Sequence, residues 1–363
     1  RSRSRSGRLL AALLLLALTL HGCAGGGPGD DEAARTEQDV DPLEMTWSPR
    51  ALANAAPCLV GWRSTGGSGS LEVLSGETSG DPVIWRSPAD ADTPYLDLMS
   101  VDPAGTSMVA SLYSDDWGTE YLQRVLLFEP DGSVRDMPLP DGFEGIADVA
   151  HCDAGLLAIA DHATVESYQT TLGMVRPGEG WTDLTLAGDV PEHQFIETLS
   201  ARPGSDLIGL VLKAAGGVDN RDEGMLVLAR LEGSMLTVVT PPFPDDSLPG
   251  AAPLLASDGV TYVRLWSGDS AALPPAMMCV EWTGAAWFEH EVVPAGSVGA
   301  GAETGQAIAQ DPEGGYWLRS ATMDAHAQTS TLLHLPPGAV VPEPTGVDLG
   351  GVAWFAWVAG EES

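Results

Sequence analysis

The chain has 363 residues, and its 17 Lys and Arg against 51 Asp and Glu give a formal net charge of −34 at pH 7. A field of this sign repels phosphate backbones, so the composition argues against nucleic-acid binding. The excess of Asp and Glu side chains would attract cations and basic partners. The alternative is that these carboxylates only keep a salt-adapted surface soluble. Apolar residues make up 44% of the chain, which predicts a folded core, and 43 Gly with 27 Pro favour tight turns over long helices.

The first 22 residues have the layout of a secretory signal peptide. Four arginines up to Arg8 precede an apolar run from Leu9 to Leu20, and Gly22 stands before Cys23. An apolar run of this length spans about 18 Å as a helix, well short of the roughly 30 Å of a bilayer core. A permanent transmembrane helix is therefore the weaker interpretation.

The segment Leu20-His21-Gly22-Cys23 resembles the lipobox of bacterial lipoproteins. The resemblance implies that residues 1–22 are removed and that Cys23 becomes the lipid-bearing N-terminus, which places the protein on a membrane of the bacterial cell envelope, outside the cytoplasm. The alternative is an ordinary secretory signal with an incidental cysteine. Residues 23–46 are rich in Gly, Pro, Asp and Glu, which predicts a flexible acidic tether.

Residues 47–363 form the predicted folded domain, where short alternating apolar runs between turns predict many strands. Two series of glycine turns recur in step along it. The first series contains Gly105, Gly155, Gly204, Gly259 and Gly314, spaced 50, 49, 55 and 55 residues apart. The second follows it by 24 to 29 residues each time and contains Gly132, Gly180, Gly233, Gly284 and Gly338. We therefore expect four antiparallel strands in each unit.

A four-stranded unit of this length resembles a β-propeller blade, although the Trp-Asp signature of WD repeats is absent. We expect an all-β propeller of six blades that acts as a monomer. Segment 47–88 reads as a blade with a poor first strand, and Val352–Val358 is expected to supply that strand and close the ring. A pair of β-sandwiches is the structural alternative, and the constant period argues against it.

Three isolated cysteines follow Cys23, namely Cys58, Cys152 and Cys279, and none has the C-x-x-C spacing of a metal site. At most two of them can pair as a disulfide in an oxidising compartment. Buried free thiols are the alternative.

In propellers, the loops between second and third strands and the loops between blades emerge on one face, here called the loop face. These are the long polar loops of this sequence, so we expect the loop face to bind a ligand. Residues 114–121 place Trp117 and Tyr121 beside Asp115 and Asp116, a set suited to stacking on a sugar or holding a cationic side chain. The alternative is that Trp117 packs against a neighbouring blade while the acids are solvated.

His162, Asp222 and His326 are further candidate ligand-binding residues of the loop face. The acidic segments 90–97 and 219–224 would suit Ca²⁺, but neither has the Gly and Glu positions of a calcium loop, so we expect no bound metal or cofactor. The sequence has no G-x-S-x-G or H-E-x-x-H motif to indicate a hydrolase or a metalloprotease.

The expected function is a membrane-tethered extracytoplasmic lipoprotein whose propeller binds a protein or a glycan. The rival hypothesis is a propeller enzyme, a hydrolase, lactonase or lyase, with an acidic site at the mouth of the central channel that could depend on Ca²⁺. A third is a structural component of the envelope. Three or more carboxylate or His side chains converging within metal-ligand distance at one channel mouth would favour the enzyme, and a mouth blocked by large side chains would count against it.

Overall fold

A computed structural model divides the chain into two units, Arg1–Asp39 and Val40–Ser363. All described residues belong to the second unit, and they are 47–65, 68–75, 83–87, 95–113, 123–163, 168–193, 195–213, 224–245, 254–266, 276–294, 308–323 and 328–360.

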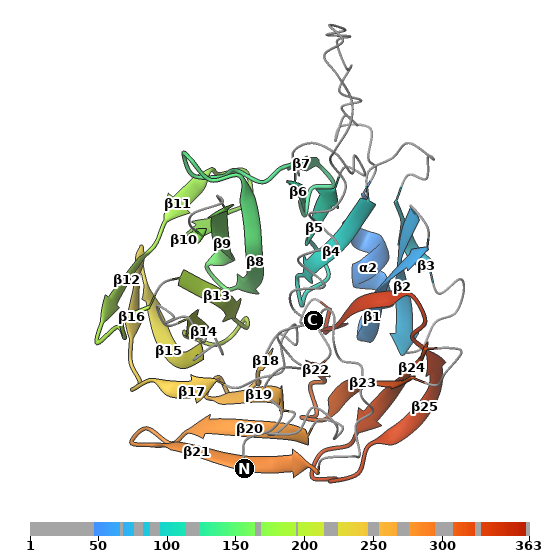
Figure 1. Ribbon diagram of the computed structural model, residues 1–363. Coiled ribbons are helices and arrows are strands. Elements are labelled where there is room, and N and C mark those ends of the chain that lie inside the picture. The colour runs from blue at the N-terminus through green and yellow to red at the C-terminus, as the bar shows by residue number, and fades with distance from the viewer. Residues whose placement is uncertain are drawn as a thin grey trace, which may run out of the picture. The chain divides into compact units, whose positions relative to one another are not determined.

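Six sheets are arranged as the blades of a propeller, and the four strands of each blade pair antiparallel (Figure 1). The innermost strands, in blade order, are β26 (Val352–Val358), β4 (Tyr95–Val101), β8 (Gly145–Cys152), β13 (Phe195–Ser200), β18 (Leu254–Leu255) and β22 (Ile308–Gln310). The second strands are β1 (Cys58–Thr65), β5 (Met108–Tyr113), β9 (Gly155–Ala163), β14 (Leu207–Lys213), β19 (Thr261–Trp266) and β23 (Tyr316–Met323).

The third strands are β2 (Ser68–Ser75), β6 (Gln123–Phe128), β10 (Tyr168–Val175), β15 (Gly224–Glu232), β20 (Ala276–Trp282) and β24 (Gln328–Leu335). The outer strands are β3 (Val83–Arg86), β7 (Val134–Asp136), β11 (Trp181–Asp183), β16 (Met235–Val238) with β17 (Phe243–Asp245), β21 (Trp287–Val293) and β25 (Glu343–Asp348). The prediction of six blades of four strands is confirmed.

The C-terminal strand closes the ring, as predicted. Strand β26 pairs antiparallel with β1, so that Trp354 lies opposite Trp62 and Ala356 opposite Val60. The first blade is therefore built from both ends of the domain. Its innermost strand comes from the C-terminus, and the other three come from the N-terminal side.

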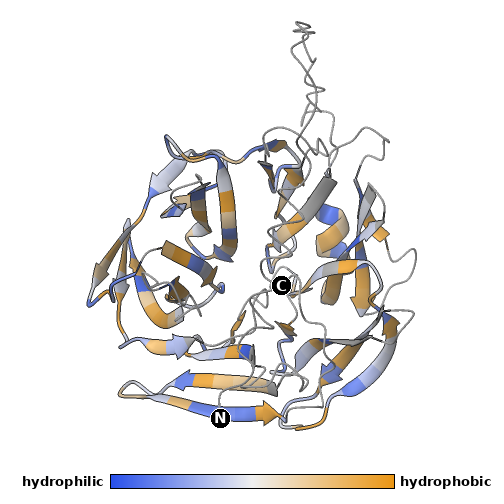
Figure 2. Ribbon diagram, in the orientation of Figure 1, coloured by the Kyte–Doolittle hydropathy of each residue, from blue (hydrophilic) through white to orange (hydrophobic). Residues whose placement is uncertain are grey.

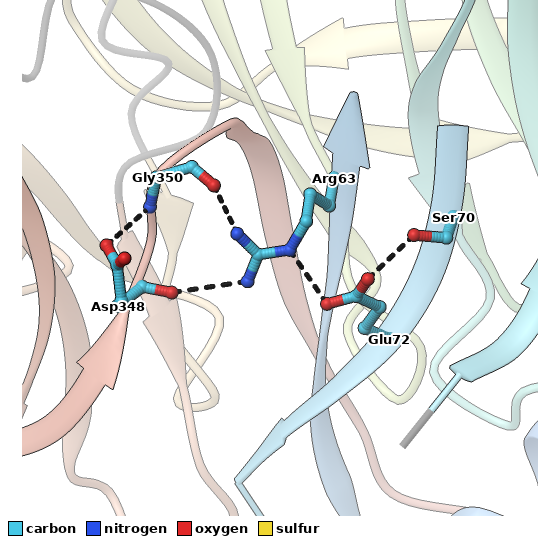
Figure 3. A network of polar contacts seen from close by, with 5 residues as sticks. All are labelled: Arg63, Ser70, Glu72, Asp348 and Gly350. Carbon is cyan, nitrogen blue, oxygen red and sulfur yellow. Dashed lines mark hydrogen bonds and ion pairs between the residues drawn. The ribbon is translucent and has the colours of Figure 1, made fainter. Parts of the chain in front are cut away.

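A network of polar contacts anchors the segment that leads into β26 (Figure 3). The Arg63 guanidinium of β1 donates to the carbonyls of Gly350 and Asp348, and its Nε lies 2.9 Å from Glu72 Oε2 of β2. Glu72 is held in turn by Ser70 Oγ at 2.7 Å. Because these bonds join the turn at 348–351 to two strands of blade 1, they help to fix the register of the closing strand.

The predicted glycine turns need a left-handed backbone, which glycine adopts without steric cost. Nine of the ten predicted glycines have a positive φ, but Gly180 does not. That prediction is wrong by two residues. The Glu179 N–H bonds to the Arg176 carbonyl at 2.9 Å, so the four-residue turn is 176–179 and Gly178, with φ 69°, occupies its third position.

Blade 4 carries an element that the repeat did not predict. Directly after β11, strand β12 (Thr185–Gly188) leaves blade 3 and pairs in parallel with β16 at the outer edge of blade 4. Outer strand β16 is also separated from β17 by residues 239–242, which include Pro241 and Pro242. Proline lacks the N–H that a ladder needs, which accounts for the break.

The core lies between neighbouring blades, where both faces of the middle strands are covered. In β14, residues 207–212 are all buried, and apolar residues predominate on such strands (Figure 2). Blades 1 and 2 share one cluster that contains Trp62 and Phe128, and Leu52 of the short helix α2 (Pro49–Ala55) belongs to it. Among the described residues, no helix has the length and apolar character needed to cross a bilayer.

Candidate functional site

A cavity of about 780 Å³ lies at one end of the central channel, and residues from the innermost strands of all six blades line it. These include Met99, Asp148, Leu199, Leu254, Ala309 and Trp354. The wall also contains Pro103, Pro203 and Pro312 from the first glycine turns of three blades. Because those turns follow the innermost strands, the cavity opens at the end opposite the loop face, here called the turn face. A volume of this size suits a small ligand or one end of a larger one.

Most predicted site residues lie outside the described residues, namely Cys23, Asp115, Asp116, Trp117, Tyr121, Asp222 and His326. The same holds for 90–94 and 219–223 of the two acidic segments. His162 is described, and it belongs to strand β9 rather than to a loop. Its Nδ1 lies 3.8 Å from Glu144 Oε1, and it is not part of the cavity wall.

His151, at the end of β8, is held between two serines of blade 2. Its Nδ1 lies 3.0 Å from Ser100 Oγ, and its Nε2 lies 3.3 Å from Ser107 Oγ. Burial lowers the pKa of His151 to about 4, while the nearby charge of Asp102 acts in the opposite direction. The imidazole is therefore neutral at pH 7, and the serine hydroxyls can satisfy either tautomer because each can donate or accept.

Asp148 joins blades 3 and 4 at the cavity wall. One carboxylate oxygen accepts from the Val149 N–H at 2.8 Å, and the other accepts from the Leu199 N–H at 2.9 Å. Burial raises the pKa of Asp148 to about 7, although both backbone hydrogen bonds favour the charged form. The same kind of staple joins the next pair of blades, where the Leu255 N–H donates to Ser200 Oγ at 2.9 Å.

The depressed pKa of His151 predicts a loss of stability in acid. Between about pH 6.5 and pH 4, His151 is protonated in the unfolded chain but stays neutral in the folded chain. The free energy of unfolding therefore falls as pH falls. Over this window we expect wild type to lose roughly 3 kcal/mol relative to His151→Gln, measured by urea unfolding. The contribution of Asp148 to the pH dependence has the opposite sign, since its raised pKa favours the folded state at low pH. Because Asp148 is present in both proteins, its contribution cancels in the comparison.

The matched control is His290→Gln, because His290 is exposed on the outer strand β21. Its unfolding free energy should follow that of wild type across the same window. Parallel pH curves for wild type and His151→Gln would contradict the assignment.

Arg202, which follows β13, extends the cavity wall toward blades 5 and 6. Its Nη1 lies 2.7 Å from Gln310 Oε1, which also accepts the Ser257 N–H at 2.7 Å. Gln310 Nε2 lies 3.3 Å from the Tyr316 hydroxyl. Burial lowers the pKa of Arg202 somewhat and raises the pKa of Tyr316, so at neutral pH the guanidinium is charged and the phenol neutral.

The three described cysteines are free thiols, which settles the choice that the sequence left open. Burial raises the pKa of Cys58 to about 11 and that of Cys279 to about 12, so these two thiols are poor nucleophiles. Within the part of the chain that the structure describes, no three His, Cys, Asp or Glu side chains are placed to hold a metal ion.

Sequence reasoning missed the cavity residues Asp148, His151 and Arg202. Each lies within seven residues before a glycine of the first turn series, Gly155 or Gly204, so the repeat could have placed them at the turn face. What the repeat could not indicate is that this end of the channel is hollow.

No protein-family model matches the chain, and no curated protein matches it. Among solved structures it is similar to a protein named as a 6-phosphogluconolactonase from Bacteroides uniformis, with 14% identity, 80% of each chain covered and a TM-score of 0.44. A protein named as TolB from Agrobacterium tumefaciens has 10% identity over 72% of this chain and 82% of its own, with a TM-score of 0.45. The β-propeller domain of the Trilobed protease from Pyrococcus furiosus has 11% identity over 70% and 72%, with a TM-score of 0.43. Similarity at this level gives no information about activity. The assignment of the fold as a propeller rests on the strand pairing of this chain itself.

Proposed function

We propose that this chain is a membrane-tethered extracytoplasmic lipoprotein whose propeller binds a protein or a glycan. We further propose that one part of this ligand binds in the turn-face cavity. The observation that carries the binding role is a cavity at the channel end lined by all six blades. Its wall carries hydrogen-bonding groups that are held in place by neighbouring blades. Few well-placed polar groups on an otherwise apolar concave wall are typical of ligand sites.

Binding is favoured over catalysis by the contacts of His151. A serine nucleophile needs a base whose second nitrogen is oriented by a further group, commonly a carboxylate. Here Ser107 occupies that second position, and the Asp102 carboxylate accepts from Thr106 Oγ1 at 2.6 Å and from the Ala104 N–H at 3.2 Å. The low pKa of His151 also makes it a weak base.

The binding role is tested by filling the cavity. Ala104 lies on its wall, in the first turn of blade 2, and Ala104→Trp would place an indole in the space. A library of short peptides and oligosaccharides is screened for a rise in the melting temperature, because a ligand of the folded state stabilises it by mass action. We expect stabilising ligands whose effect is lost in Ala104→Trp. Ligands that stabilise both proteins equally would place the site elsewhere, for example on the loop face.

The tether is tested by Cys23→Ala, with the chain expressed in a bacterium behind an added initiator methionine. We expect the wild-type chain in the membrane fraction with its signal removed and its mass raised by lipid. Cys23→Ala should keep its signal or leave the membrane, while Cys152→Ala, the control, behaves as wild type. An unchanged mass and fractionation for Cys23→Ala would contradict the lipoprotein assignment.

The rival function is a serine hydrolase, because Ser100 Oγ lies 3.0 Å from His151 Nδ1, within the hydrogen-bond distance of a nucleophile and its base. A fluorophosphonate probe labels activated serines, so it separates the two functions directly. We expect no labelling of the folded wild-type chain. Labelling that disappears in Ser100→Ala would establish the hydrolase instead.

A further inference from the structure

Among the described residues that line the turn-face cavity, Arg202 is the one Lys or Arg. This position is unusual in a chain with 17 basic and 51 acidic residues. Within the described part of the chain Arg202 makes no ion pair, and its one hydrogen bond is the 2.7 Å contact to Gln310 Oε1. A guanidinium has five N–H donors, so most of its hydrogen-bonding capacity is unused by those residues.

Gln310 fixes where this charge lies. The residue is buried at 7% exposure, and its Oε1 accepts the Ser257 N–H at 2.7 Å. A backbone N–H must face the oxygen of the amide and not its NH₂ group, so the oxygen is also the atom that faces Arg202. Gln310 therefore holds the guanidinium from blade 6 while Arg202 itself extends from blade 4.

The acids around the cavity are already engaged in the fold. Both oxygens of Asp153 lie 3.0 Å from the Gly204 N–H, and Asp148 accepts two backbone N–H groups. Asp258, whose charge acts on Arg202, accepts three hydrogen bonds of 2.6 to 2.9 Å within its own turn. These carboxylates are tied to donors of their own, whereas the guanidinium of Arg202 keeps unused donors at the wall.

We propose that the turn-face cavity binds a small organic carboxylate, or a carboxylate group of a larger ligand, through Arg202 held by Gln310. The planar fork of a guanidinium matches the two oxygens of a carboxylate, and the pair gains strength where water is excluded. A cavity of about 780 Å³ also leaves room for the organic part of such a ligand beside Trp357. This inference rests on the proposed binding function and adds the chemical class of the ligand.

The experiment compares probe pairs that differ only in the charged group: benzoate with benzamide, glucuronate with glucose, and N-acetylglycine with its amide. Binding is measured by calorimetry and by shifts of the Arg202 Nε–H resonance, assigned by its loss in Arg202→Gln. We expect the acid of at least one pair to bind and its neutral partner to bind about tenfold to hundredfold more weakly. The pair that responds identifies whether the source resembles an aromatic acid, an acidic sugar or a peptide C-terminus.

Two variants complete the design. Arg202→Gln should remove the preference for the acid, whereas Arg230→Gln should not, because Arg230 belongs to the same blade but pairs with Asp206 at 2.8 Å on the surface. Acid binding that survives Arg202→Gln would overturn the inference, as would the absence of a preference in every pair. If neutral probes bind in the cavity as well as the acids do, the binding function stands and only the carboxylate is wrong. If no probe or library ligand binds there, both proposals fail.

Discussion

Deletion of residues 352–363 is expected to prevent formation of a stable propeller. The deletion removes β26, whose Val352, Trp354, Phe355 and Val358 are all buried. Each large apolar side chain contributes about 1.5–3 kcal/mol when buried, and a domain has only about 5–15 kcal/mol in total. The loss also exposes the backbone edge of β1 along the register from Cys58 to Arg63, which invites aggregation. Size-exclusion chromatography and circular dichroism with thermal melting test this result.

A peptide of residues 349–360 provides the test that the missing strand itself is responsible. Added to the truncated chain, it should pair with β1 and restore a cooperative melting transition.

A single substitution in β26 tests the same role of the strand with a smaller loss of stability. Phe355 is fully buried beneath the Arg319 guanidinium, so Phe355→Ala should cost about 3–5 kcal/mol. Phe288→Ala is the control, since Phe288 is 58% exposed. A truncated chain with the wild-type transition would contradict closure by β26.

The number of blades and their closure could be predicted because both depend on local chemistry that repeats. A turn with positive φ selects glycine, so Gly105 and its counterparts mark the same point in every blade. Segment 352–358 is strand-like and the first blade has a poor first strand of its own, so the two could be paired, as the register of β26 on β1 confirms. Where a turn contains two glycines, as at 178–180, the spacing alone does not decide which one carries the positive φ.

The cavity could not be predicted because it depends on contacts between distant blades. Arg202 and Gln310 are 108 residues apart, and His151 meets Ser100 across 51 residues. The local sequence around Arg202 or His151 does not indicate which distant residue it contacts. Strand β12 was missed for a similar reason, since its pairing with β16 joins two blades. The loop-face candidates around Trp117 lie outside the described residues and remain predictions.

Replacing Gly69 with valine is expected to destabilise the first blade strongly, because the Trp62 ring occupies the place of its side chain. A Cβ at Gly69 would lie 1.9 Å from an atom of that ring, and Trp62 is fully buried with its ring centre 5.9 Å from that of Trp85. The ring cannot move away without disturbing the core that blades 1 and 2 share. We expect Gly69→Val to lower the free energy of unfolding by about 3 kcal/mol, measured in urea.

Trp62 is the cause of this cost, and a double-mutant cycle can demonstrate it. Trp62→Ala alone should cost about 3–5 kcal/mol through the cavity it leaves. In the double variant the valine enters that space, so the two losses should be clearly less than additive. Gly180→Val is the matched control, since apart from the adjoining residues nothing lies within 4 Å of the Cβ position of Gly180, and its φ is not positive. It should change stability by less than about 0.5 kcal/mol, and additive losses in the cycle would contradict the packing of Trp62 on Gly69.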